Sequence, residues 1–155
     1  MGFECHLGQH QECIENALSK AEYICKERAV QFTKLRRRVL ELIWQGHKPC
    51  KAYDLLKELQ KEDSAAKPPT VYRALDFLHE HGLIHRINRL NAYIGCKNPK
   101  QVDPSFLLVC LSCDNVEEVN HQTYQKFFED MISNNQFQCQ SKTFEIEGIC
   151  QNCRS

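Results

Sequence analysis

The chain has 155 residues, of which 42% are hydrophobic and 26% charged, and its formal net charge at pH 7 is zero. This length allows one domain or two small ones, each with a packed core. The sequence has no run of about 18 apolar residues, and its first residues lack a basic segment followed by an apolar one. We therefore expect a cytoplasmic protein without a membrane partner.

The charges are distributed unevenly along the chain. Residues 15–95 carry 15 Lys and Arg against 10 Asp and Glu, whereas residues 97–155 carry 5 against 8. The basic excess of the N-terminal part favours contact with phosphates.

The cysteine content is high, with ten cysteines in the chain. In a reducing compartment, clustered thiols are more often metal ligands or redox centres than disulfides.

Three amphipathic helices are predicted in the first 65 residues. Residues 1–14 are expected to form a flexible start that holds four soft metal ligands, Cys5, His6, His10 and Cys13. Apolar residues then recur at helical spacing over residues 14–28, from Thr33 as an N-cap to Gly46, and from about Lys51 onward. Because the second helix carries Arg36, Arg37 and Arg38, it presents a solvated face or a phosphate clamp.

A fourth helix is predicted within residues 67–85. Pro69 suits a first helical position and Gly82 suits a left-handed C-terminal cap. Apolar side chains at helical spacing form one inward stripe, made by Val71, Ala74, Leu75 and Leu78. Thr70, Tyr72 and Arg73 point elsewhere at the helix start, which is typical of a DNA-reading helix.

A strand hairpin is predicted directly after this helix. Residues 83–87 and 92–96 are strand-like and are separated by polar residues 88–91. A hairpin appended to a helix-turn-helix is a wing. We therefore expect a winged helix-turn-helix domain over residues 1–96.

The C-terminal part has a different periodicity. Residues 97–104 contain two prolines and no period, which predicts a hinge. Beyond it, residues 106–110, 116–119 and 144–147 are strand-like, and Tyr124 to Ile132 follow a helical pattern. The expected fold class is α+β, with a small α/β domain over residues 105–155.

Two C-x-x-C pairs are the strongest metal signal in the chain. Each pair, Cys110 with Cys113 and Cys150 with Cys153, supplies two thiolates from one turn. Two such turns make the closed tetrahedral site that Zn²⁺ favours. Both pairs follow strand-like runs, so we expect them at strand ends of one sheet. A thioredoxin-type redox pair would require a βαβ context, which neither motif has.

Catalysis is not expected. A four-thiolate zinc site leaves no open position for a water molecule. In addition, neither C-x-x-C pair follows a proline, as the zinc deaminase motif requires. We expect neither an enzyme nor a small-molecule substrate.

Several single residues receive simpler interpretations. We expect packing roles for two cysteines, a strand position for a third, surface positions for two histidines and a helix cap from a third; these are Cys25 and Cys50, Cys139, His79 and His81, and His121.

The chain resembles the ferric-uptake-regulator family over residues 15–153. The resemblance is carried by residues 33–85, by the hinge and by the two C-x-x-C pairs. Residues 52–56, Ala-Tyr-Asp-Leu-Leu, and residues 67–78 are similar to the zinc-uptake branch rather than to the iron-sensing one.

The resemblance implies a homodimeric, zinc-responsive transcriptional repressor of zinc uptake genes that binds a pseudo-palindromic operator in double-stranded DNA. It implies base contacts by Tyr53 and Arg73, which suit thymine methyl groups and guanine edges. Thr70 and Tyr72 suit phosphate contact at the helix start. Arg36 matches an arginine of the family that follows a threonine cap.

The resemblance also implies a second, regulatory zinc ion, so that two ions per chain are expected. His85, Cys96 and Glu118 fall on three of the family's ligand positions, and Asp103 stands where the family has a hinge histidine. This departure leaves the metal choice open, so a regulator that senses iron or manganese is an alternative. A thiol redox switch that acts on DNA affinity is another.

Overall fold

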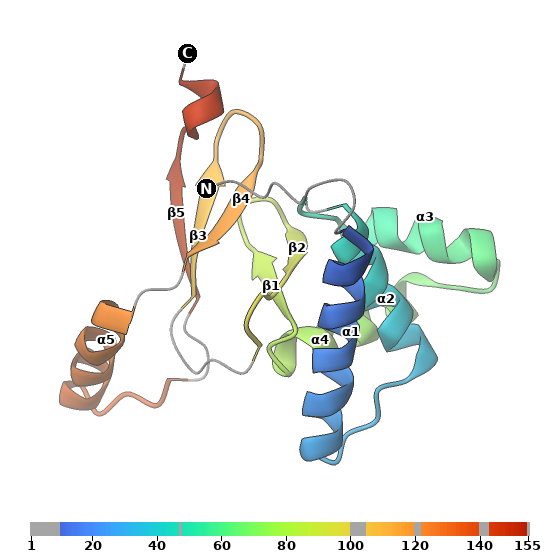
Figure 1. Ribbon diagram of the computed structural model, residues 1–155, viewed down its shortest axis with the longest axis horizontal. Helices are drawn as coiled ribbons and strands as arrows, with labels where there is room; N and C mark the ends of the chain where they lie inside the picture. Colours follow the sequence, from blue (N-terminus) through green and yellow to red (C-terminus); the bar gives the residue numbers. More distant parts are fainter. Residues whose placement is uncertain (1–9, 47, 100–104, 120–121, 140–142, 155) are drawn as a thin grey trace. The chain divides into compact units, whose positions relative to one another are not determined.

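A computed structural model describes residues 10–46, 48–99, 105–119, 122–139 and 143–154. The chain divides into two compact units, Met1–Lys100 and Gln101–Ser155. The expected hinge, residues 97–104, spans this division, and residues 100–104 lie outside the described part. Within the described residues, no helix combines the length and the apolar character that crossing a membrane requires. The combination of winged helix and small α/β unit confirms the expected α+β class (Figure 1).

The described residues of unit 1 form four helices, α1 (His10–Glu27), α2 (Lys34–Gln45), α3 (Ala52–Glu62) and α4 (Pro68–Glu80). The α1 helix begins at His10, so residues 10–13 form its first turn rather than part of a flexible start. Thr33 caps α2 as predicted, because its side chain accepts a hydrogen bond from the Arg36 N–H. Gly82 follows α4 with φ +71°, which is the predicted left-handed turn.

The inward stripes of the four helices build the core of unit 1. Members from each helix are almost fully buried, among them Ala21, Leu40, Leu55 and Leu75. Deletion of a side chain at such a position typically costs about 2–5 kcal/mol. This core holds α3 and α4 in fixed orientations, so that their outer faces form one rigid surface.

The wing is an antiparallel hairpin of β1 (Ile84–Ile87) and β2 (Ala92–Gly95). Two backbone hydrogen bonds between Cys50 and Tyr93, of 2.9 and 2.8 Å, attach this hairpin to the segment that precedes α3. Trp44 of α2 packs on Gly95 so closely that a Cβ atom there would lie 2.3 Å from the indole ring. The wing is therefore tied to the helices at two places.

Unit 2 contains a three-stranded sheet in the order β4-β3-β5, formed by β3 (Ser105–Cys110), β4 (Val116–Val119) and β5 (Thr143–Gly148). The β3 strand pairs antiparallel with β4 and parallel with β5. The α5 helix (Gln122–Asn134) packs by Phe128 against Phe106 and Phe144, with ring centroids 5.9 and 4.5 Å apart. A short 3-10 helix, η1 (Gln151–Cys153), follows β5.

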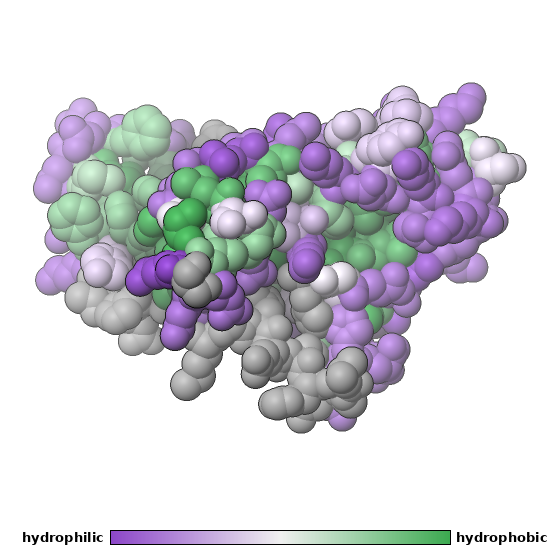
Figure 2. All heavy atoms as spheres, turned by 90° about the horizontal axis from the view of Figure 1, so that it is seen from above, coloured by the Kyte–Doolittle hydropathy of each residue, from purple (hydrophilic) through white to green (hydrophobic). Residues whose placement is uncertain are grey.

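The two units differ in the apolar side chains that they expose. Among the described residues of unit 2, eight large hydrophobic residues are exposed: Leu108, Leu111, Tyr124, Phe127, Met131, Phe137, Ile146 and Ile149. In the part of unit 1 that the structure describes, the corresponding residues are three tyrosines, Tyr23, Tyr53 and Tyr72. Figure 2 shows green, apolar side chains over α5 and mainly purple, hydrophilic ones over α3.

Candidate metal centre and DNA-binding surface

The parallel pairing of β3 and β5 brings the two C-x-x-C pairs together. Cys110 ends β3 and lies opposite Gly148 at the end of β5, so the turn that carries Cys150 begins beside Cys110. The Sγ atoms of Cys110, Cys113, Cys150 and Cys153 all lie within 4.8 Å of one another. The sequence expectation of two pairs at neighbouring strand ends agrees with this geometry.

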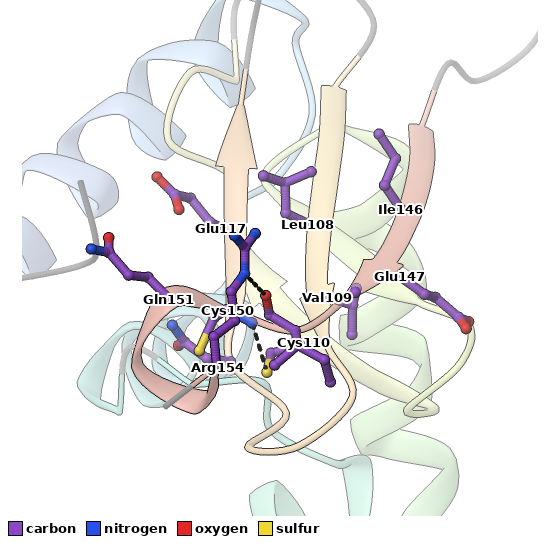
Figure 3. A pocket seen from close by; sticks show the side chains of 12 residues that line it. Leu108, Val109, Cys110, Glu117, Ile146, Glu147, Cys150, Gln151 and Arg154 are labelled. Carbon is purple, nitrogen blue, oxygen red and sulfur yellow. Dashed lines mark hydrogen bonds between the residues drawn. The ribbon is translucent and has the colours of Figure 1, made fainter.

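Backbone N–H groups point at the sulfur atoms of this cluster. The Cys150 N–H donates to Cys110 Sγ over 3.3 Å, as Figure 3 shows by a dashed line. Hydrogen bonds from the N–H groups of Cys150, Cys113 and Ser112 lower the pKa of the Cys110 thiol to about 6. Donors of this kind stabilise a thiolate, which is the form that binds metals.

The Cys153 thiol differs from that of Cys110, because its pKa is raised. At Cys153 the Ser112 side chain lowers the pKa, but hydrogen bonding with the sulfur atoms of Cys150 and Cys113 and burial together raise it to about 12. Four thiolates at this spacing repel one another unless a cation neutralises them. The donor set, its spacing and its N–H···S bonds therefore fit a tetrahedral Zn²⁺ ion, whose binding would release the remaining protons.

A pocket of about 330 Å³ adjoins this cluster on one face of the sheet (Figure 3). Leu108 of β3 and Ile146 of β5 line it together with Glu117 of β4, and Cys110 and Cys150 border it. Arg154 closes one side, where its Nε donates to the Ile149 carbonyl over 3.2 Å. The exposed Leu108 and Ile146 make this an apolar surface beside the four cysteines.

The remaining expected metal ligands lie in different units. In unit 1, the Cys96 N–H donates to the Leu83 carbonyl over 3.0 Å, which continues the register of β1 and β2 by one pair. His85 and Cys96 therefore lie on the same face of the hairpin, as diagonal neighbours, and both are buried. In unit 2, Glu118 is buried on β4 and accepts a 3.2 Å hydrogen bond from Ser105 Oγ. Asp103 lies outside the described residues.

The residues expected to contact DNA lie on the outer surface of α3 and α4. Thr70, Tyr72 and Arg73 are exposed in the first two turns of α4, while the inward stripe of the same helix is buried. Tyr53 is 64% exposed near the start of α3, and the Lys57 ammonium lies 4.4 Å from its ring centroid. A small pocket is lined by both Tyr53 and Tyr72, which shows that the two side chains share one surface.

The arginines of α2 make contacts within unit 1 instead of forming a free cationic face. The Arg36 guanidinium lies 3.6 Å above the Phe77 ring and also donates to the Gln31 carbonyl. Arg37 pairs with Glu22 of α1, and Arg38 pairs with Glu62 of α3. These pairs are partly exposed, so each contributes at most about 1 kcal/mol to stability.

Some expectations for single residues need correction. Cys139 lies after α5, outside any strand, because β5 begins only at Thr143. His79 is exposed as expected, but His81 is half-buried, with its ring 4.4 Å from Phe77 and its carbonyl bound by Arg28. Burial, followed by the charge of Arg28, lowers the pKa of His81.

The two cysteines expected to be packing residues lie in or against the core of unit 1. Cys25 is fully buried and Cys50 half-buried against the core, as expected for packing residues. His10 and Cys13 both lie on α1. The Nε2 atom of His10 is hydrogen-bonded to the Gln45 carbonyl oxygen at 2.7 Å. Cys5, His6 and His121 lie outside the described residues.

Two residues of the surface expected to contact DNA were not found from the sequence. Lys51 and Asn91 line the pocket beside Tyr53 and Tyr72. Asn91 has φ +46°, and an asparagine between two strand-like runs is a known signal for such a turn. No sequence pattern distinguishes Lys51. Its place at the pocket depends on the attachment of the wing beside Cys50, which brings the start of α3 close to the hairpin.

Comparison with known proteins gives consistent similarities. The model of the ferric uptake regulator family matches residues 27–147. The zinc uptake regulation protein of Escherichia coli K12 is 34% identical over 140 residues, which cover 90% of this chain and 82% of that protein.

Solved structures agree with this match. A zinc uptake regulator complexed with zinc and DNA is 34% identical, with a TM-score of 0.81, and the match covers 90% of this chain and 94% of that one. Holo XcZur is 35% identical with a TM-score of 0.76, over 88% of this chain and 95% of that one. This chain therefore belongs to the ferric uptake regulator family.

Proposed function

We propose that this protein is a zinc-responsive transcriptional repressor that binds specific operators in double-stranded DNA and controls zinc uptake genes. The observation that carries the proposal is the similarity, over 90% of the chain, to a regulator whose structure contains both zinc and DNA. The exposed Tyr53, Tyr72 and Arg73 on one surface of a winged helix support it from the residues themselves. The family assignment favours such a regulator, working on DNA in the cytoplasm, over an enzyme.

The structural role belongs to the four-cysteine cluster. Cys110, Cys113, Cys150 and Cys153 would hold one Zn²⁺, which would join the β3 turn to the segment after β5. Their spacing and the N–H groups aimed at Cys110 support this assignment. A four-thiolate site is closed, which suits a structural ion rather than one that exchanges with a sensed pool.

The regulatory role is assigned to His85, Cys96, Asp103 and Glu118, which would make two zinc ions per chain. The burial of His85 and Cys96 on one face of the wing supports their part, and the buried Glu118 supplies a carboxylate. Imidazole, thiolate and carboxylates form a donor set that zinc accepts. Ligands drawn from both units would favour one DNA-competent conformation, so ligand binding would shift a conformational population.

The DNA-binding role is assigned to the outer surface of unit 1. Arg73 and Tyr53 would contact bases in the major groove, whereas Thr70, Tyr72 and Arg36 would contact phosphates. A homodimer would place two such surfaces on the half-sites of a pseudo-palindrome. The large hydrophobic residues exposed on unit 2 support a dimer interface there, since exposed apolar patches mark interaction sites.

The decisive experiment is a titration of operator binding with Zn²⁺, Fe²⁺ and Mn²⁺ under reducing conditions, with metal content measured in parallel. We start from protein whose regulatory site has been stripped of metal. Of the three metals, we expect zinc to restore operator binding at the lowest free concentration. Asp103→Ala is expected to raise the zinc concentration that binding requires. A response to iron or manganese at lower concentrations than zinc would identify a sensor of those metals instead. Binding that is lost on peroxide treatment without metal loss would identify a redox switch.

A further inference from the structure

A small pocket lies where α3, α4 and the wing meet in unit 1. Its volume is about 120 Å³, and it is lined by six residues: Lys51, Ala52, Tyr53, Tyr72, Asn91 and Tyr93. Lys51 and Ala52 come from the start of α3, Tyr72 comes from the second turn of α4, and Asn91 comes from the turn of the wing. The core of unit 1 and the bonds between Cys50 and Tyr93 hold these segments together.

Hydrogen-bond donors from three segments line this pocket, and none of the six residues is acidic. Two potential donors are the ammonium of Lys51, the residue before α3, and the hydroxyl of Tyr72 on α4. On the wing, the Asn91 carbonyl oxygen accepts a 3.4 Å bond from Arg86, so the amide nitrogen is the donor end of that side chain. The Arg86 guanidinium adds positive charge behind it. The lining therefore suits a small anion.

The volume limits what this pocket can hold. Pockets for ordinary small molecules have volumes of roughly 300–1,000 Å³. A space of about 120 Å³ suits a group of a few atoms, such as a phosphodiester. The exposed Tyr53 and Tyr72 line the pocket, and Arg73 follows Tyr72 on α4.

We propose that this pocket seats one backbone phosphate of bound DNA in each chain. The proposal rests on the DNA-binding function proposed above and adds Lys51 and Asn91 to its binding surface. A phosphate held by both helices and the wing would set the register of the duplex on Tyr53 and Arg73. Lys57, whose ammonium lies above the Tyr53 ring, would restrain that ring while the duplex docks.

Three substitutions remove one donor each with little change of backbone. Lys51→Met keeps the aliphatic chain, Tyr72→Phe removes only the hydroxyl, and Asn91→Gly suits the positive φ at that turn. Lys26→Met is the matched control, because Lys26 lies exposed in the last turn of α1 and does not line the pocket. Thermal unfolding followed by circular dichroism verifies that each variant is folded.

The first measurement is the salt dependence of binding by the zinc-loaded full chain. The probes are a duplex selected by the wild-type protein from a random pool and a fixed random-sequence duplex. For Lys51→Met we expect weaker binding to both by the same factor. The slope of log K against log salt should be shallower by about 0.9 per lost contact, or about 1.8 per dimer. Lys26→Met should match the wild type.

The second measurement locates the phosphate. Each phosphate of the selected duplex is replaced in turn by a neutral methylphosphonate. For the wild type, methylphosphonate at one position in each half-site should lower the affinity. For Lys51→Met and Asn91→Gly, the same replacement should leave the affinity unchanged. Identical sensitivity in wild type and Lys51→Met would overturn the proposal. The proposal would also be overturned if Lys51→Met lost the preference for the selected over the random duplex while its salt slope stayed that of the wild type. That result would indicate that Lys51 contacts a base. A wild-type protein that selects no duplex from the pool and does not bind the random-sequence duplex would overturn the DNA-binding function itself.

Discussion

At the scale of single residues, we expect Arg73 and Thr70 to make two different kinds of DNA contact from one helix. Both are exposed in the first turns of α4, and the buried stripe of the helix fixes the direction of their side chains. A guanidinium recognises guanine through two parallel hydrogen bonds, whereas a hydroxyl at a helix start suits a phosphate oxygen. The two residues should therefore differ in what their loss does to sequence discrimination.

Arg73→Ala is expected to reduce the preference for operator over random duplex by the value of one bidentate contact, about 1–3 kcal/mol. Affinities for both duplexes, measured by fluorescence anisotropy at one salt concentration, give this preference. Thr70→Val should weaken both affinities and leave their ratio unchanged. Sedimentation should show the same oligomeric state for both variants and the wild type. An Arg73→Ala protein with an unchanged ratio would remove the base contact from this residue.

The residue scale also shows where a sequence pattern was ambiguous. The run Arg36-Arg37-Arg38 allowed either a solvated face or a phosphate clamp, but the three side chains bind Phe77, Glu22 and Glu62 of other segments. Partners 15 and 24 residues away for Arg37 and Arg38 have no local signal. The proposed phosphate contact of Arg36 therefore requires its guanidinium to move off Phe77 or to bind DNA from that position.

At the scale of secondary-structure elements, the close packing of the wing on α2 is the feature with the clearest energetic consequence. Gly95 is necessary because the Trp44 ring occupies the space where a Cβ atom would lie. Cys96 follows directly in the chain, so a displaced β2 would also displace a proposed zinc ligand.

Gly95→Ala is expected to destabilise unit 1 by about 1–3 kcal/mol, the usual range for overpacking. Gly46→Ala is the matched control, since the nearest atom to its added Cβ would be the Lys48 nitrogen at 3.9 Å. Urea unfolding of both variants, followed by circular dichroism, measures the difference. If the two substitutions lower the midpoint equally, the Trp44 contact does not restrain the wing.

Element positions were well predicted from the sequence because they depend on local chemistry. Thr33 before α2, the prolines at the start of α4 and Gly82 after it act through their own backbone groups. The start of α1 was placed four residues too late, because its first turn carries no apolar stripe before Ile14. Cys139 was placed in a strand although no local pattern distinguished it from a connecting segment.

At the scale of the whole molecule, the two proposed zinc sites should differ in how much metal binding contributes to folding. The four-cysteine cluster joins chain segments that are about 40 residues apart, as the bond from Cys150 N–H to Cys110 Sγ shows. A zinc ion there would contribute folding free energy to unit 2. The regulatory ion, by contrast, should be removable without unfolding of the protein.

We expect two zinc ions per chain in the fully loaded protein, and one in Cys153→Ser and in Cys96→Ser, as measured by mass spectrometry under native conditions. Cys153→Ser should lower the thermal midpoint, because the structural ion is lost. Cys96→Ser should keep the midpoint and lose zinc-dependent DNA binding. One ion in the wild type that Cys153→Ser abolishes would leave no regulatory ion to account for zinc sensing.

The sequence by itself determined the helices and strands, the α+β class, the family resemblance and the two C-x-x-C pairs, because each depends on residue types at short spacing. Only the tertiary structure decided that β3 and β5 run parallel, which places the four sulfur atoms within 4.8 Å of one another. Likewise, only the attachment of the wing to the start of α3 placed Lys51 and Asn91 at one pocket. Such contacts join residues far apart in the chain, and no local pattern specifies which distant segments pack together.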